Sequence, residues 1–126
     1  MSWSFSNDRP IFQQLVDIII LKILSGEYQP GFKLDAVRDL AVTAGVNPNT
    51  MQRALSEIEN TGIIYTKRGD GRYVTEDTGK IAEVRNSYVA EKTRGFVESV
   101  KTLGLTVNEI SEAVKNVLNE GGNSDG

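Results

Sequence analysis

One stretch decides the fold: residues 34–74 read LDAVRDLAVTAGVNPNTMQRALSEIENTGIIYTKRGDGRYV. Gly45 predicts a tight turn, because glycine adopts a positive φ at little cost. Asn47 is a typical helix cap, and Pro48 behind it suits the first helical position. The apolar residues that follow recur at helical spacing and are expected to be buried: Met51, Ala54, Leu55 and Ile58. With a short helix capped by Asp35 ahead of the turn, the stretch predicts a helix-turn-helix.

The end of the same stretch predicts a β-hairpin. Residues 63–67 and 72–75 are rich in β-branched and aromatic side chains, and a short loop containing Gly69 and Gly71 joins them. A sheet of two strands must pack on other elements to be stable, and here those elements are the helices. A hairpin directly after a helix-turn-helix is a wing. The combination is typical of proteins that place one helix in a DNA groove.

A longer helix is expected before this stretch. Residues 8–10 read Asp-Arg-Pro, and proline is tolerated at the first helical position. Gly26 ends the helix. Its apolar residues recur with a helical period: Ile11, Leu15, Ile18, Ile19 and Ile23. The sequence thus predicts a winged helix-turn-helix of three helices and a hairpin over residues 1–78.

The C-terminal part changes character. Residues 80–103 are largely polar and helical in pattern, and Gly104 interrupts them. Thr106 and Glu109 then have the spacing of a capping box for a last helix. The predicted protein is therefore α+β. Its expected parts are a DNA-binding domain at 1–78, a small two-helix dimerisation region at 79–120 and a disordered glycine-rich tail at 121–126.

Composition narrows the function classes. A chain of 126 residues can bury one modest core with a small appendage. It has no cysteine and no histidine, which removes the thiol nucleophile, the commonest general base and the commonest metal ligand. We expect neither an enzyme nor a metal or cofactor site. The longest apolar run, residues 18–21, cannot cross a bilayer, and no secretion signal is visible, so a cytoplasmic protein without membrane contact is expected.

Net charge gives little help in identifying a partner. The formal charge of the chain is −3, which as an average argues mildly against nucleic acid. Between residues 46 and 73, however, the sequence contains four cationic and three anionic side chains, a local charge of +1. The field at the docking face governs association more than the average does. DNA binding therefore rests on the pattern of residues and not on charge.

The helix after the turn carries the candidate base contacts. In a helix-turn-helix the N-terminal residues of this helix face the major groove. Arginine there reads guanine, asparagine and glutamine read adenine, and threonine contacts phosphate or a methyl group. Taken singly, any such residue is more often an ordinary solvated side chain. The candidates on this helix are Asn47, Asn49, Thr50, Gln52 and Arg53.

The wing and the short helix supply further candidates. A cationic hairpin tip can enter a narrow minor groove, although alone it would be a flexible solvated turn. Asp70 is unfavourable in that role and is expected to point away from DNA. Arg38 can grip the DNA backbone or form a surface ion pair with Asp35 or Asp39. The candidates in the hairpin are Lys67, Arg68, Gly69, Gly71 and Arg72.

Association is expected through the two C-terminal helices. Alone, they would leave part of their apolar surface exposed, and exposed patches of this kind mark association. We therefore predict a homodimer formed through residues 80–120. The side chains expected at its interface are Ile81, Val84, Tyr88, Val89, Phe96, Val100, Leu103, Ile110, Val114, Val117 and Leu118.

A further set of motifs extends over about half of the chain: Pro10–Leu15 (PIFQQL), Gly26, Pro30, Gly31, Leu34, Val37, Arg38, Asp39, Leu40, Ala41, Val46, Asn47, Pro48, Thr50, Arg53, Ala54, Leu55, Gly62, Ile63, Ile64, Gly69, Gly71, Tyr73 and Val74. In these residues the chain resembles the winged-helix domain of GntR-family regulators. The match extends from Pro10 to about Val74, with its motifs in order and spacing. In the present numbering, Asp35-Ala36 stands where the family usually has Pro-Ser, and Arg72 replaces a small hydroxyl residue.

The resemblance implies a bacterial transcription regulator that contacts DNA through Arg38, Asn49, Thr50, Gln52, Arg53, Gly69 and Gly71. The short C-terminal part resembles the YtrA-type subfamily, which implies a dimeric repressor of an operon such as one for an ABC transporter, bound to a palindromic operator. Two alternatives stay open. One is a winged-helix protein-interaction module without DNA binding. The other is a metabolite sensor whose small-molecule effector binds at the dimer cleft, beside Tyr88 or Phe96.

Overall fold

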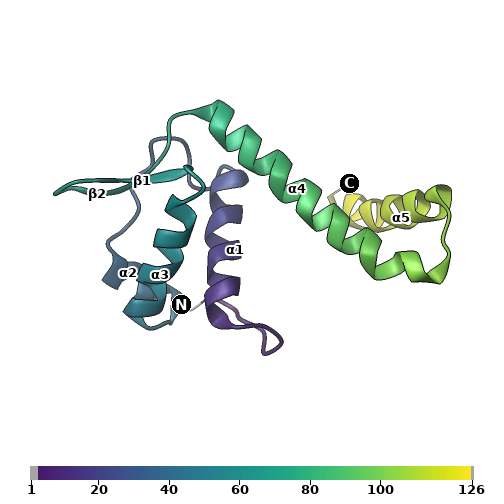
Figure 1. The fold of residues 1–126 in the computed structure, drawn as a ribbon, viewed down its shortest axis with the longest axis horizontal. Helices are drawn as coiled ribbons and strands as arrows, with labels where there is room; N and C mark the ends of the chain where they lie inside the picture. The colour runs from purple at the N-terminus through teal and green to yellow at the C-terminus, as the bar shows by residue number, and fades with distance from the viewer. Residues whose placement is uncertain (1–2, 126) are drawn as a thin grey trace. The chain divides into compact units, whose positions relative to one another are not determined.

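The computed structural model describes residues 3–125, with side chains described up to residue 121. The chain forms two compact units, Met1–Ser87 and Tyr88–Gly126. Within the described residues, five helices and one two-stranded antiparallel sheet confirm the predicted α+β class and the winged helix-turn-helix (Figure 1). The elements are α1 (Ile11–Leu24), α2 (Val37–Ala44), α3 (Pro48–Glu59), β1 (Ile64–Lys67), β2 (Gly71–Val74), α4 (Thr78–Val100), a 3-10 turn (Lys101–Leu103) and α5 (Val107–Asp125).

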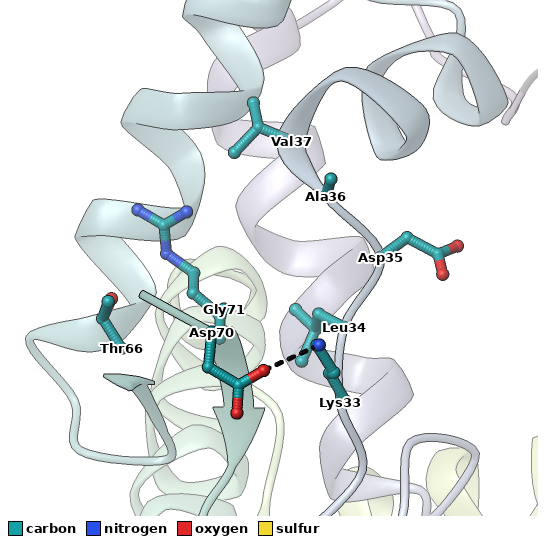
Figure 2. Close-up of a pocket in the computed structure, with 9 residues that line it drawn as sticks. Lys33, Leu34, Asp35, Ala36, Val37, Thr66, Asp70 and Gly71 are labelled. Carbon is teal, nitrogen blue, oxygen red and sulfur yellow. Dashed lines mark hydrogen bonds and ion pairs between the residues drawn. The ribbon is translucent and has the colours of Figure 1, made fainter. Parts of the chain in front are cut away.

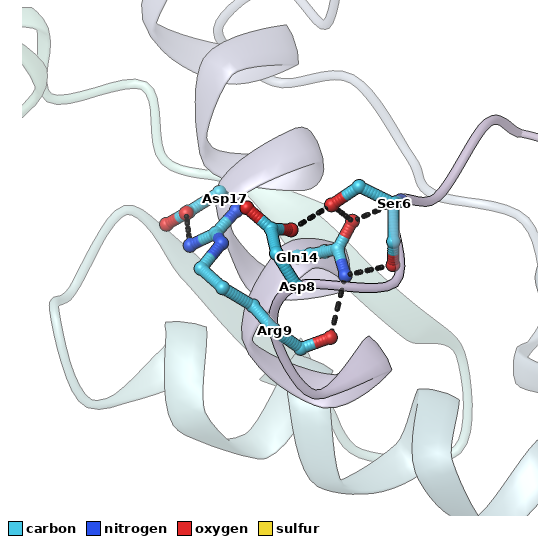
Figure 3. A network of polar contacts seen from close by, with 5 residues as sticks. All are labelled: Ser6, Asp8, Arg9, Gln14 and Asp17. Carbon is cyan, nitrogen blue, oxygen red and sulfur yellow. Dashed lines mark hydrogen bonds and ion pairs between the residues drawn. The ribbon is translucent and has the colours of Figure 1, made fainter.

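A buried glutamine fixes the way the chain enters α1, which begins directly after Pro10 (Figure 3). The Gln14 side chain is only 6% exposed. Its Oε1 accepts a hydrogen bond from the Ser6 N–H at 2.8 Å, and its Nε2 donates to the carbonyls of Ser6 at 2.9 Å and Arg9 at 2.7 Å. A buried amide left without partners would be costly. These bonds therefore hold residues 6–9 in place ahead of the helix.

The predicted turn between α2 and α3 is confirmed. Gly45 has a φ of 77°, and its N–H donates to the Ala41 carbonyl at 2.8 Å, which closes α2. Asn47 caps α3 as expected, since its Oδ1 accepts the Asn49 N–H at 2.7 Å, and Pro48 occupies the first helical position.

The predicted cap of α2 is wrong. Helix α2 follows Ala36, and no side chain caps its start, so Asp35 lies in the preceding extended segment. The reason is the hairpin, which keeps the segment before α2 in an extended conformation. The Leu34 N–H donates to the Arg72 carbonyl at 2.9 Å, and Lys33 forms an antiparallel bridge with Tyr73. The chain can turn into a helix only after these bonds end.

The wing is a regular hairpin. Strands β1 and β2 pair from Ile64 with Val74 to Lys67 with Gly71, which leaves three residues at the tip. Gly69 at that tip has a φ of 76°, a value that side chains disfavour. In Figure 1 the hairpin extends from the end of α3, and α3 and β1 are in contact.

One hydrophobic core holds α1, α2, α3 and the hairpin together. Helices α1 and α3 pack directly on each other, and α2 packs on α3. The predicted stripe of α3 is confirmed, because Met51, Ala54, Leu55 and Ile58 are at most 1% exposed. Ile11 departs from its expected stripe and is 48% exposed in the first turn of α1. The remaining buried apolar residues are Leu15, Ile19, Ile23, Leu24, Leu34, Leu40, Ala41, Ala44, Ile63, Ile64, Val74 and Ile81.

The first turns of α4 belong to the N-terminal unit. Ile81 is only 5% exposed, and the Arg85 guanidinium donates to the Leu24 carbonyl at the end of α1, at 3.1 Å from its Nη2. Such a bond satisfies one of the carbonyls that a helix end leaves unpaired. The two compact units are accordingly divided inside α4, between Ser87 and Tyr88, whereas the sequence places the domain boundary at the start of that helix.

The second unit contains the rest of α4 and α5. Gly104 has a φ of 71° and closes the 3-10 turn. The predicted capping box is confirmed, because Thr106 N–H donates to Glu109 Oε1 at 2.8 Å and Glu109 N–H donates to Thr106 Oγ1 at 3.1 Å. Helix α5 extends to Asp125, into the tail that the sequence predicts to be disordered, and Gly126 lies outside the described residues.

Candidate DNA interface

The outer face of α3 presents polar side chains near its N-terminus. Asn49, Gln52 and Arg53 are exposed, and Thr50 is half-buried. They lie where the sequence predicts them, because the buried stripe of α3 turns the other face of the helix outward. The Oδ1 atom of Asn47 is occupied by the cap. Asn47 therefore shapes the start of the helix, and its neighbours carry the donors and acceptors that can meet base edges.

Arg53 is held by an aromatic ring. Its guanidinium carbon lies 4.4 Å from the centre of the Phe12 ring on α1, a cation–π contact. No hydrogen bond or ion pair joins Arg53 to any residue of the part that the structure describes. Sequence reasoning singled out Arg53 and missed Phe12, whose role depends on the packing of α1 against α3.

At the tip of the wing, Asp70 is turned toward its own hairpin and the loop beside it. Its carboxylate accepts hydrogen bonds from Lys33 Nζ at 2.8 Å and from the Tyr73 hydroxyl at 2.7 Å. These two bonds hold the pKa of the Asp70 carboxyl below its ordinary value, and the same pairing raises the pKa of Lys33. Arg68 and Gly69 are exposed beside it. The charge of Asp70 is thus offset by Lys33. Lys33 is a cation beside the wing that sequence reasoning missed.

Arg72 does not point from the wing as the sequence suggests. Its Nε donates to Glu59 Oε1, at the end of α3, at 2.6 Å, and the Thr66 hydroxyl donates to the same oxygen at 2.6 Å. The Arg72 side chain is 17% exposed and that of Glu59 29%. Burial opposes ionisation of Glu59, yet the bonds from Thr66 and Arg72 and the arginine charge hold its pKa below the ordinary value. Arg72 therefore fastens the wing to α3.

Replacing Glu59 with glutamine is expected to lower the free energy of unfolding at pH 7 by about 0.5–1.5 kcal/mol, because two charge-assisted bonds weaken. The folded pKa of Glu59 is depressed, so its contribution is complete above the unfolded pKa of about 4.3 and is lost as pH falls through the folded value. Thermal unfolding at pH 7 and pH 3 checks this, with exposed Glu57 changed to glutamine as the matched control. Equal stability of the two variants at pH 7 would contradict the role of Glu59.

A pocket of about 500 Å³, lined by both charged and apolar residues, lies between the segment before α2 and the wing (Figure 2). Lys33 and Arg72 line it together with Asp35 and Asp70, so its charges balance. Figure 2 shows the Lys33–Asp70 ion pair across this space. Arg38, in the first turn of α2, is exposed and forms no ion pair with Asp35, Asp39 or another described residue. Arg38 is thus available for an external anion, whereas the pocket cations are already paired.

The predicted dimer residues differ in exposure. Ile81 is buried within its own chain, and Val84, Tyr88, Val100 and Ile110 are half-buried. The others expose large parts of their side chains: Val89, Phe96, Leu103, Val114, Val117 and Leu118, at 40–71%. Within the second unit, a groove of about 300 Å³ is lined only by Phe96, Ala113, Val114, Val117 and Leu118. All five are apolar, so the groove forms an exposed apolar surface within residues 88–121.

The described residues include no group of three or more histidine, cysteine, aspartate or glutamate side chains placed to hold a metal ion. Across residues 3–125, no helix has the length and hydropathy needed to span a bilayer.

Comparisons with known proteins agree with this geometry. The family model for bacterial regulatory proteins of the gntR family matches residues 12–74. The chain is 39% identical to the uncharacterized transcriptional regulator YhcF of Bacillus subtilis (strain 168), over 97% of the chain and 100% of that relative. It is 31% identical to the transcriptional repressor YtrA of the same organism, over 86% of the chain and 84% of that relative.

A solved structure supports the same assignment. A GntR family transcriptional regulator from Listeria monocytogenes superposes with a TM-score of 0.84 and 41% identity, and the match covers 89% of this chain and 98% of that one. These relatives are regulators of transcription and not enzymes. The matched residues 12–74 contain α2, the turn, α3 and the wing, so this chain carries their type of DNA-binding domain. The chain belongs to the GntR family of bacterial regulatory proteins.

Proposed function

We propose that this protein is a homodimeric repressor that binds a palindromic operator in a sequence-specific way. The observation that carries the proposal is the outer face of α3, where Asn49, Gln52 and Arg53 are exposed and Arg53 keeps all its N–H donors unused by described residues. Asparagine and glutamine match adenine, and arginine matches guanine. The recognition helices of a dimer would enter successive major grooves about one helical turn apart.

Phosphate contacts are assigned to the elements beside α3. Arg38 is exposed and forms no ion pair with described residues, and Lys67, Arg68 and the glycines Gly69 and Gly71 form or flank the wing tip. Such groups position a protein on the duplex without reading its sequence. Arg72 supports the wing through Glu59, so its part in binding is indirect.

The dimer is proposed to form through the groove lined by Phe96, Ala113, Val114, Val117 and Leu118. A second copy of α5 can cover this surface with its own apolar side chains, as in a two-fold interface where both partners use the same patch. A relative named a repressor, YtrA, resembles this chain over most of its length, which supports repression and the YtrA-type subfamily. By the same resemblance the target would be an operon such as one for an ABC transporter.

A ligand-gated sensor is the second candidate, and the apolar groove is the observation in its favour. Phe96, one of the two residues named for this alternative, lines the groove within a single chain, whereas Tyr88 is not among its lining residues. A volume of about 300 Å³ lies at the lower end of what small-molecule sites have. A ligand that binds only the folded protein would raise its thermal stability. A metabolite that raises the melting temperature and weakens operator binding would establish this function.

Selection from a pool of random duplexes tests the main proposal. Purified protein is incubated with the pool at near-physiological salt, and the bound fraction is amplified and sequenced. We expect enrichment of a two-fold-symmetric site with half-sites about one turn apart or somewhat more. If a folded, dimeric protein enriches no sequence, direct operator recognition is wrong, and a protein-interaction module or a ligand-dependent DNA binder becomes the better account.

Replacing Arg53 with alanine is expected to weaken binding to the selected operator by about 1–3 kcal/mol and to relax the preference at one base pair of each half-site. Fluorescence anisotropy with the operator and its single-base variants measures both effects. Changing the exposed Asn60, at the C-terminal end of α3, to alanine is the control. Wild-type affinity in the Arg53 variant would show that this side chain does not read the operator.

A further inference from the structure

The contact between Arg53 and Phe12 leaves the recognition edge of the arginine free. The guanidinium lies with its carbon 4.4 Å from the ring centre, so the aromatic ring holds it without using a hydrogen bond. The five N–H donors of a guanidinium point outward in its plane. None of those of Arg53 donates to a described residue.

Three other arginines of the N-terminal unit are held in the opposite way. Arg9 donates to Asp17, Arg72 donates to Glu59 and Arg85 donates to the Leu24 carbonyl. In each of them, N–H donors are occupied by hydrogen bonds within the chain, and the side chain has a structural role. Arg53 is ordered by its contact with a ring, and its donors remain available for another molecule.

Ordering an arginine before binding favours recognition of a planar target. A free arginine side chain loses much rotamer freedom when it binds, and a contact that is already present reduces that loss. Guanine presents O6 and N7 in the major groove, a pair of acceptors that matches the guanidinium edge. Phe12 is half-buried at the start of α1, and α1 packs firmly against α3, so the ring is itself held in place.

We propose that Phe12 is a positioning residue for base recognition: its ring holds Arg53 in the orientation that reads a guanine, and so sets part of the operator specificity without touching DNA. This inference rests on the proposed function, since it concerns the same recognition helix. It adds a determinant of operator specificity that lies on α1, outside the helix-turn-helix. A list of the residues that contact bases would not include it.

The test uses the full chain, the operator found by selection and its single-base variants. Replacing Phe12 with leucine keeps an apolar side chain and removes the ring, whereas tyrosine keeps the ring. We expect the leucine variant to lose about 3–10-fold in discrimination at the base pair whose preference depends on Arg53, with smaller changes at other positions. The tyrosine variant should discriminate within about two-fold of wild type.

A double-mutant cycle separates positioning from simple packing. In a protein that already carries Arg53→Ala, Phe12→Leu should have no further effect on discrimination, because the side chain that it positions is absent. A ring that only stabilises the fold would lower the melting temperature and affect every base variant alike. Equal discrimination by wild type and the leucine variant, or an equal loss in both backgrounds, overturns the inference.

A measurement on the DNA-free protein keeps this inference distinct from the proposed function. The side-chain protons of Arg53 should show an upfield ring-current shift by NMR in wild type and in Phe12→Tyr, and no such shift in Phe12→Leu. Its absence in wild type would refute the positioning contact even if the protein binds its operator. A wild-type protein that shows the shift but selects no DNA site would refute operator recognition, and with it the specificity role of Phe12.

Discussion

Truncating Leu55 to alanine is expected to lower the free energy of unfolding of the N-terminal unit by about 2–5 kcal/mol. Leu55 is 1% exposed and lies in the stripe by which α3 packs into the core. Removing three carbons there loses burial of apolar surface and leaves a cavity that close-packed neighbours fill only in part. Chemical denaturation followed by circular dichroism measures the effect, since α1, α2 and α3 are expected to unfold together.

The matched control is Val42 changed to alanine, because Val42 lies on the neighbouring helix α2 and is 80% exposed. Its effect should stay within about 0.5 kcal/mol. The Leu55 variant should also bind the operator less well at temperatures near its own unfolding, since the same stripe fixes the outer face of α3. A loss below about 1 kcal/mol for the Leu55 variant would mean that α3 is not anchored as the structure shows.

The sequence predicts most of the fold because its signals are local. Gly45 and Asn47 act within a few residues of themselves, and the stripe of α3 follows from helical spacing, so the turn, the cap and the buried face are all confirmed. The cap assigned to Asp35 failed for a non-local reason. The hydrogen bond from Leu34 and the bridge from Lys33 to the distant strand β2 keep that segment extended, and nothing in residues 34–37 alone reveals them.

In the candidate site, too, local features could be predicted from the sequence and contacts between distant elements could not. Exposure of Asn49, Gln52 and Arg53 follows from the helical pattern, but the partners of the cations do not. Arg72 is paired with Glu59 across the end of α3, and Phe12 meets Arg53 across two helices. Such contacts depend on how elements pack, and residue types at given spacings cannot distinguish a paired arginine from a free one.

Replacing Val117 with glutamate is expected to abolish the proposed dimer and to weaken operator binding by about 10³-fold or more, because specific affinity exceeds non-specific affinity by at least about that factor. Val117 is 66% exposed and lines the apolar groove with Phe96 and Leu118. A second copy that covers this groove would bury the new carboxylate without a partner, which is unfavourable. Glutamate is a good helix former, so α5 itself should persist. Light scattering after gel filtration reports the dimer, and anisotropy reports DNA binding.

The matched control places the same charge one residue earlier, at Asn116, which is exposed on α5 and does not line the groove. This variant should stay dimeric and bind the operator nearly as wild type does, since successive residues of a helix point about 100° apart. If both variants remain dimeric, the second copy does not cover the groove and the dimer forms elsewhere. If the Val117 variant is monomeric yet retains wild-type affinity, each half-site is bound independently. Binding as a dimer would then contribute nothing to operator recognition.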